Sequence, residues 1–259
     1  GGAWPGYASI QRDPTAVVAY PLEAVTIGSP DQASFAAQHS GGEYAVTYAK
    51  MRLFGTSDGA TAIPLASNVR AVGNLVSAPK GAGAAGAVSG NPFRDNSNIA
   101  VLGNEFTQVG TTDPNLWDGL YHVLYLGGPR ARTVFSIVSE NEVGWNYFHD
   151  NAANRAINFF NSPSRPSDVI TWAMTKNRIH DNVIINQVGD GILLGSGTVG
   201  ENWILRNTLL NVGLQVPGGA VGGGGIAIRA SDPNGSGQVT PTNQPLLLHL
   251  VGNTITNAG

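Results

Sequence analysis

The chain has 259 residues, no cysteine and a formal net charge of −3 at pH 7, and only 12% of its residues are charged. The absence of cysteine excludes disulfides, thiolate metal sites and a cysteine nucleophile, and so small a net charge gives no support for nucleic-acid binding. No run of apolar residues is long enough to span a bilayer, so the sequence predicts no membrane span.

The first 65 residues predict short strands and one helix. Apolar runs at 16–20 and 24–28 are punctuated by Pro and Gly, which is typical of short strands. Residues 31–42, which follow Pro30 and end in two glycines, are the best candidate for a helix. Residues 44–54 resemble one degenerate coil of the repeat that becomes clear further along the chain.

Several later segments predict loops. Residues 77–97 are rich in glycine and alanine, and we expect a flexible loop there that buries little. Further insertions are predicted at 107–122, 161–166 and 212–224. Long loops on a stiff scaffold are where binding and catalytic residues usually lie.

Asparagine recurs along most of the chain in a unit that places two asparagines five residues apart, as in Asn177 and Asn182. The shortest interval between copies, 25 residues from Asn182 to Asn207, is about one three-sided coil, and the longer intervals add a surface loop. Repeats of this length with insertions are typical of solenoids. When the copies are aligned, one asparagine per coil falls at the same position: Asn74, Asn104, Asn146, Asn182, Asn207 and Asn253.

The residues around these asparagines indicate strands that meet at a corner. Apolar residues two apart, such as Ile99 and Val101, have the period of a strand, and asparagine tolerates the backbone angles of a corner. If the copies stack at the ~4.8 Å spacing of paired strands, their asparagines form a hydrogen-bonded ladder. A polar residue follows four positions later in five copies and predicts a second stack: Gln108, Asp150, Asn186, Asn211 and Asn257.

A further strand is predicted after each corner, at Ala156–Phe159, Gly191–Leu194 and Gly225–Ile228. In these features the chain resembles the right-handed parallel β-helix proteins of the pectin-lyase-like superfamily, whose coils carry the same Asn-x-apolar corner followed by Gly-Ile. The resemblance covers residues 65–259.

This resemblance implies an all-β fold, a right-handed parallel β-helix solenoid with an asparagine-rich corner ladder and long loops on one side. We expect a single domain over residues 1–259. Within it, residues 1–65 would form irregular N-terminal coils and residues 66–259 regular coils with loop insertions.

The sequence lacks the signature motifs of the best-known enzymes in this superfamily. The motifs of the calcium-dependent pectate lyases, the polygalacturonase-like hydrolases and the mannuronan epimerases are all missing. The resemblance therefore implies the fold and transfers no catalytic residue to this chain. The superfamily also includes phage tailspikes and adhesins, which leaves a non-catalytic role open.

Reactive side chains gather around the insertion at 107–122. A polysaccharide lyase needs a base that removes the proton alpha to a carboxylate, and a cation such as Arg, Lys or calcium that neutralises this carboxylate. Residues of these types, which we predict as catalytic, are His122, Tyr125, Arg130 and Arg155. Hydrolysis would instead require two facing carboxylates, for which the sequence offers Asp118, Asp150 and Asp190. No metal ligands are assigned, and calcium is the one cofactor that this chemistry could use.

Outward aromatic rings on a flat parallel sheet can stack on sugar rings. We predict as substrate-binding residues Trp117, Tyr121, Trp145 and Asp150. Two alternatives stay open, because Asp150 can simply occupy the polar corner stack and Trp117 can pack in a small core beneath a loop.

Two His-Asp pairs, His149-Asp150 and His180-Asp181, fall on opposite sides of the asparagine corner and are not expected to stack. This placement argues against a repeated metal site. His180 aligns with apolar residues of other coils, which predicts partial burial. Asp181 aligns with Arg206, which predicts a surface ion pair.

Two functions fit these features. The first is extracellular polysaccharide binding, with lyase-type elimination on an acidic glycan favoured over hydrolysis. The second is a non-catalytic structural, adhesin or fibre-type role. The Gly1-Gly2 start and the Thr, Asn and Ser content favour a processed protein that is secreted or displayed at the cell surface. The last corner, Asn253–Asn257, has no capping helix after it, so we expect either further chain or end-to-end, homo-oligomeric stacking.

Overall fold

The structure is a computed structural model, and the residues that it describes are 26–28, 49–51, 63–65, 67–77, 86–90, 96–112, 121–127, 135–160, 171–195, 200–214, 223–228 and 246–259. These segments form short β-strands and turns and contain no helix. Accordingly, none of the described segments supplies a helix with the length and apolar character needed to cross a membrane. The helix expected at 31–42 lies outside the described residues.

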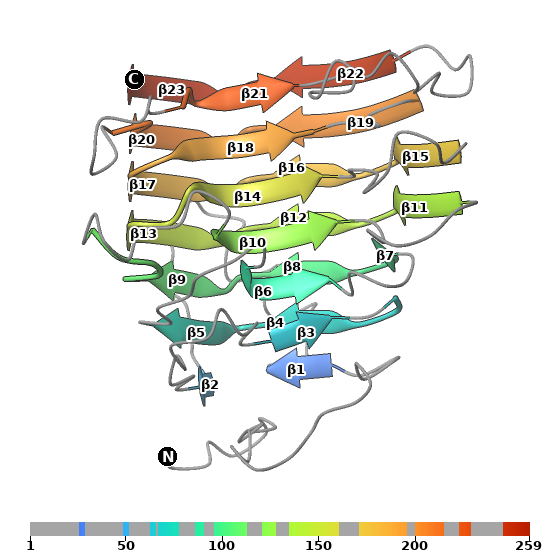
Figure 1. Cartoon of the computed structure of the whole chain (residues 1–259), viewed down its shortest axis with the longest axis horizontal. Helices are drawn as coiled ribbons and strands as arrows, with labels where there is room; N and C mark the ends of the chain where they lie inside the picture. The colour runs from blue at the N-terminus through green and yellow to red at the C-terminus, as the bar shows by residue number, and fades with distance from the viewer. Residues whose placement is uncertain are drawn as a thin grey trace.

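The strands stack one above another into a parallel β-helix, with the earliest strands at the bottom of Figure 1 and the last at the top. All four sheets are parallel, so each strand pairs with the equivalent strand of the coil before or after it. This architecture confirms the all-β parallel solenoid that the asparagine repeat predicted.

Two sheets of seven strands form two sides of the solenoid. The first sheet contains, in spatial order, β1 (Thr26–Gly28), β4 (Arg70–Val72), β8 (Ala100–Leu102), β12 (Glu142–Gly144), β16 (Arg178–His180), β19 (Gly200–Leu205) and β22 (Leu246–Val251). The second contains β2 (Ala49–Met51), β5 (Asn74–Ser77), β9 (Glu105–Thr107), β13 (Tyr147–Asn151), β17 (Val183–Gln187), β20 (Thr208–Val212) and β23 (Thr254–Ala258).

Two further sheets complete the coils. The third sheet contains, in spatial order, β21 (Ile226–Ile228), β18 (Asp190–Leu194), β14 (Arg155–Phe160), β10 (His122–Gly127), β6 (Gly86–Gly90) and β3 (Ile63–Leu65). The fourth contains β15 (Thr171–Thr175), β11 (Phe135–Ser139) and β7 (Asn96–Ser97). The strands predicted after each corner are therefore confirmed as β14, β18 and β21.

The core is a column of apolar side chains that runs along the inside of the solenoid. Successive side chains of a strand point to opposite faces, and the register places Val101, Val143 and Ile179 of the first sheet directly above one another. In the second sheet Phe106 and Phe148 stack with ring centroids 4.6 Å apart. All five side chains are at most 1% exposed and belong to one continuous cluster.

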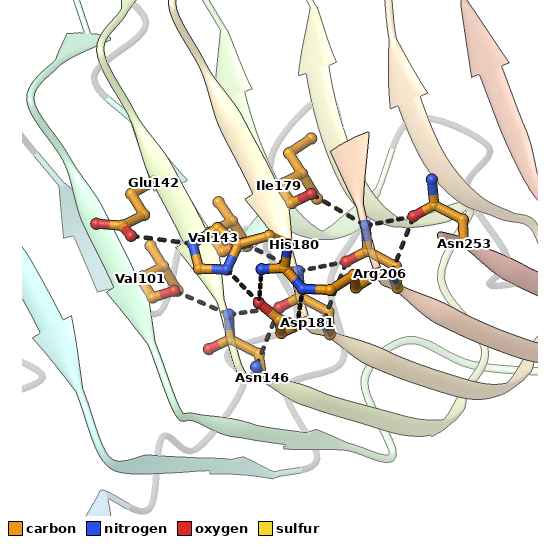
Figure 2. Close-up of polar contacts among 11 residues, drawn as sticks. Val101, Glu142, Val143, Asn146, Ile179, His180, Asp181, Arg206 and Asn253 are labelled. Carbon is orange, nitrogen blue, oxygen red and sulfur yellow. Dashed lines mark hydrogen bonds and ion pairs between the residues drawn. The ribbon is translucent and has the colours of Figure 1, made fainter. Parts of the chain in front are cut away.

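An asparagine ladder holds the corner between the first and second sheets (Figure 2). The Asn146 side-chain amide donates to Asn182 Oδ1 at 2.9 Å and to the carbonyl oxygen of Val101 at 2.8 Å. Its Oδ1 accepts from both the backbone and side-chain nitrogens of Asn104, each at 2.9 Å. Consecutive members are joined by the same side-chain bond at 2.9 Å, which confirms the predicted ladder: Asn74, Asn104, Asn146, Asn182, Asn207 and Asn253.

A second inner ladder lies five residues earlier, at the entrance to the first sheet. The side-chain amide of Asn141 donates to Asn177 Oδ1 at 2.9 Å, and that of Asn177 donates to Asn202 Oδ1 at 3.1 Å. For Asn141 and Asn177 the spacing of five places one asparagine on each side of a short strand, whereas Asn202 lies within β19. All three side chains are at most 1% exposed.

The residue on the outer side of each corner adopts a positive φ. Beside the main ladder these residues include Trp145 and Asp181, with φ of 54° and 52°, while Gly103 occupies the same place in an earlier coil. Left-handed backbone is unusual for a tryptophan, and the two hydrogen-bonded ladders on either side hold it there. Trp145 thus lies at the same corner position as Gly103 and Asp181.

The prediction of a flexible loop at 77–97 is wrong for residues 86–90, because these residues form the fully buried strand β6. Small residues are needed in this strand because its neighbours leave no room. A Cβ added to Gly86 would crowd Tyr125, and one added to Gly90 would collide with the Asn96 side chain. At Gly86 and Gly90, glycine is therefore required by close packing.

Replacing Asn146 by Ala should lower the free energy of unfolding by on the order of 3 kcal/mol, because buried donors on Asn104 and the carbonyl of Val101 lose their partner. Urea denaturation measures this loss. The control is Asn98→Gly, which keeps a positive-φ corner and removes only an exposed side-chain bond to Asn68; it should cost less than about 1 kcal/mol. Equal losses in the two variants would contradict the ladder's role.

Candidate functional site

The third sheet is covered on both faces. Strands β6, β10 and β18 are buried at every position, although alternate residues must point to opposite faces. On β10, Leu124 and Leu126 belong to the core, whereas Tyr125 between them belongs to neither hydrophobic cluster. A Cβ added to Gly127 would collide with the Tyr125 ring. Tyr125 therefore lies on the outer face, over Gly127.

Tyr125 is part of an outer row that crosses the third sheet. The strand register aligns it with Ser89 of β6 on one side and with Asn158 of β14 on the other, and Asn158 aligns in turn with Leu193 of β18. The exposed fraction is 5% for Tyr125, 4% for Ser89, 1% for Asn158 and 0% for Leu193. Buried polar side chains thus lie side by side on the outer face.

His122 joins this row at the start of β10. Its ring stacks on that of Tyr125, with centroids 5.4 Å apart and an angle of 20° between the planes, and it is 4% exposed. The pairing of Leu124 with Ile157 places His122 and Arg155 at equivalent positions, each two residues earlier on neighbouring strands. Two predicted catalytic residues are in ring contact, and a third begins the next strand.

Arg155 forms an ion pair across the sheet. Its Nε donates to Asp190 Oδ2 at 2.9 Å, and the two residues are paired in the register of β14 and β18. The side chains are only 16% and 9% exposed, respectively. The carboxylate of Asp190 therefore compensates the guanidinium charge, so an anionic ligand would have to compete with it.

These residues make up what we call the outer polar cluster: Ser89, His122, Tyr125, Arg155, Asn158 and Asp190. Arg130, the fourth predicted catalytic residue, lies outside the described residues, as do Trp117 and Asp118. The sequence pattern indicated neither Ser89 nor Asn158 as a site residue. The available signal was the polar side chain of Asn158 between two core residues of a predicted strand.

Tyr121, predicted to bind substrate, belongs to the core cluster and is 2% exposed. Burial raises the pKa of Tyr121 to about 12. Among the described residues its hydroxyl has no hydrogen-bond partner. Tyr121 thus lies inside the solenoid and away from the outer row.

Trp145, also predicted to bind substrate, packs on the outside of the first sheet. Its ring lies against a small apolar cluster of Val72, Ala100 and Leu102. The rings of Trp145 and His180 meet edge to face, with centroids 4.6 Å apart. This packing gives the half-buried ring a structural role as the cover of that cluster.

Asp150 occupies the polar corner stack that the sequence predicted as its alternative role. The Asn186 side-chain amide donates to Asp150 Oδ1 at 2.7 Å, Asn211 donates to Asn186 at 3.1 Å, and Asn257 donates to Asn211 at 3.1 Å. In this outer stack the donor always belongs to the later coil. Asp150 is thereby fixed at a corner of the second sheet, separate from the strands of the outer polar cluster.

His149 lies between two carboxylates. Its Nε2 is 2.8 Å from Glu105 Oε1 and its Nδ1 is 2.8 Å from Asp150 Oδ2. Burial alone would lower the pKa of His149, but the hydrogen bonds to Asp150 and Glu105 outweigh burial and raise it above its usual value. The hydrogen bond from His149 is the main cause that lowers the pKa of Asp150.

A similar arrangement surrounds His180 on the first sheet (Figure 2). Its Nε2 is 2.9 Å from Glu142 Oε1, and its Nδ1 is 2.8 Å from Asp181 Oδ2. Arg206 binds both oxygens of Asp181, at 2.7 and 2.6 Å. The predicted ion pair and the burial of His180, which is 6% exposed, are both confirmed.

The hydrogen bond to His180 lowers the pKa of Glu142. Burial would raise the pKa of Asp181, but Arg206 and His180 together lower it. His149 and His180 lie on different sheets, as predicted. Within the described part of the chain, no group of three or more His, Asp or Glu side chains is arranged to hold a metal ion.

A column of stacked rings runs along the outside of the first sheet. The register aligns Arg178, Trp203 and His249. The guanidinium of Arg178 lies 5.6 Å from the Trp203 ring centroid, and the His249 ring is nearly parallel to Trp203 at 5.6 Å. Because the neighbouring coils supply Trp203 with these stacking partners, the ring serves contacts between coils.

The stacked coils, inner asparagine ladders and paired outer corners define a parallel β-helix protein with one buried polar cluster on the outer face of its third sheet. Comparison with protein families, with characterised proteins and with solved structures finds no match to this chain.

Replacing Asp150 by Asn should lower the pKa of His149, because one of its two carboxylates is removed while the corner keeps a side chain that tolerates positive φ. Nuclear magnetic resonance titration of the imidazole measures the change. Asp181→Asn, in the other histidine network, is the control and should leave His149 unchanged. An unmoved titration in Asp150→Asn would show that Asp150 does not set the pKa.

The raised pKa of His149 in the folded protein also predicts that stability depends on pH. Because the pKa of His149 is higher in the folded than in the unfolded state, its contribution is fully present below the unfolded value of ~6.5. It is lost as pH rises through the folded pKa. The urea midpoint of the wild type should therefore exceed that of Asp150→Asn by more at about pH 5.5 than at about pH 8.5. A difference that does not change with pH would contradict this.

Proposed function

We propose that this chain is an extracellular, pectin-lyase-like protein that binds a polysaccharide at the outer polar cluster. The observation that carries the proposal is the adjacency of His122, Tyr125 and Asn158 on two neighbouring strands. A ring pair and an amide on a rigid sheet suit sugar recognition, because rings pack on the apolar faces of sugars and amides bind their hydroxyls. Groups fixed by a solenoid also lose little conformational entropy on binding.

On an acidic glycan, we propose elimination rather than hydrolysis. His122 or Tyr125 would accept the proton alpha to the sugar carboxylate, the bond to the leaving oxygen would break to form an unsaturated sugar, and a proton from solvent would complete the leaving hydroxyl. Arg155 would neutralise the carboxylate by exchanging its contact with Asp190, with calcium as an alternative cation. Hydrolysis is less favoured because Asp190 is held by Arg155 and Asp150 by His149.

The experiment is incubation with polygalacturonate, alginate, xylan and a mixed-linkage glucan, with and without calcium. Binding is measured by affinity electrophoresis, elimination by the ultraviolet absorbance of unsaturated sugars, and hydrolysis by new reducing ends. We expect binding and ultraviolet absorbance with an acidic polymer, and both should be lost in His122→Gln. The matched control is His249→Gln, which changes a histidine of the terminal coil and should retain both.

Each outcome decides one part of the proposal. Reducing ends without ultraviolet absorbance would overturn elimination in favour of hydrolysis. Binding without either product would support a role in binding alone and overturn the proposed enzymatic activity. A folded wild type that binds none of the four polymers would overturn the polysaccharide proposal.

A second candidate function is a structural solenoid whose ends stack on one another. The observation that favours it is an apolar end surface on the last described coil, where Leu247 and Leu250 are each 52% exposed and Val251 is 59% exposed. Asn253 also ends the ladder there. The coil of a second copy is the partner we propose, because strand edges pair readily with other strands.

Sedimentation velocity over a range of protein concentrations tests this second candidate. We expect concentration-dependent association, which Leu250→Lys should abolish by placing a charge on the end surface. Leu214→Lys is the control, since Leu214 is a leucine 41% exposed in a corner outside the terminal coil. A wild type that stays monomeric at every concentration would overturn stacking.

A further inference from the structure

Asn158 stands out because it is buried without being satisfied. It is 1% exposed, and among the described residues its Oδ1 has no hydrogen-bond partner. Leaving a carbonyl buried and unpaired is unfavourable, and native proteins pair the great majority of such groups. A group that remains unpaired therefore calls for an explanation.

The position of Asn158 in β14 shows which side the amide faces. Its neighbours Ile157 and Phe159 are both 0% exposed and belong to the core cluster. Since alternate residues of a strand point to opposite faces, Asn158 points outward. The register puts it directly beside Tyr125 of β10.

Tyr121 and Gln187 also bury an unpaired oxygen, but they differ in place. Tyr121 belongs to the core cluster, and Gln187 is aligned with Val212, another core residue. Their unpaired oxygens therefore lie inside the solenoid and not on its outer face. Asn158 combines an unpaired oxygen with an outward direction and an adjacent aromatic ring.

We propose that Asn158 Oδ1 accepts a hydrogen bond from a sugar hydroxyl of a polysaccharide bound in the outer polar cluster. This inference rests on the proposed function and names the group that is recognised. A carbonyl oxygen accepts from a hydroxyl and repels a carboxylate. Asn158 therefore selects for a neutral hydroxyl of the sugar that lies against Tyr125.

The first part of the test is stability without ligand. Asn158→Leu removes the unpaired oxygen at similar volume, so its urea midpoint should equal or exceed that of the wild type. The matched control is Asn151→Leu. Asn151 is equally buried, but its Oδ1 accepts from Val109 N at 2.9 Å and its amide donates to the carbonyl oxygen of Phe106 at 3.1 Å. The midpoint of Asn151→Leu should fall.

The second part is binding to the same four polymers. Asn158→Leu should weaken binding by at least about tenfold, since the bound hydroxyl loses its acceptor. A urea midpoint that falls as far as that of Asn151→Leu would overturn the inference, because Asn158 would then be a structural residue. Unchanged binding in a stable Asn158→Leu would overturn it as well, while leaving the proposed function in place. Failure of the wild type to bind any polymer would overturn both.

Discussion

Every coil of a solenoid must turn corners without leaving buried peptide groups unpaired, and asparagine meets this constraint here. One Asn146 side chain accepts from two nitrogens of Asn104 and donates to Asn182 and to a carbonyl of the previous coil. Because each amide serves three coils, the register of one coil fixes that of the next. These bonds therefore align the core column, the outer corners and the polar cluster from coil to coil.

The sequence was informative wherever a local pattern repeats. The asparagine spacing predicted the ladder, and alignment on it placed Asp181 beside Arg206. The same alignment predicted that His180 would be buried and that Asp150 could belong to the polar stack. These predictions succeeded because stacked coils turn a one-dimensional alignment into spatial contact.

The sequence was less informative where packing between coils decides the outcome. Residues 86–90 have the composition of a linker, yet they form a buried strand. Glycine stands at its two ends because Tyr125 and Asn96 leave no room for a larger side chain there. The outward amide of Asn158 was hidden inside an apolar strand pattern. The Arg155–Asp190 pair could not be predicted either, since loops of varying length separate one coil from the next.

The two kinds of amide stack have opposite directions. In the inner ladder, Asn146 donates to the later coil through Asn182, whereas in the outer stack Asn211 donates to the earlier coil through Asn186. Side-chain amides carry dipoles that align along such chains. The bonds between side chains therefore run in opposite directions along the axis in the two sets. A coil that carries both sets adds side-chain bonds of both directions, whereas every residue added to an α-helix contributes a peptide dipole of the same direction.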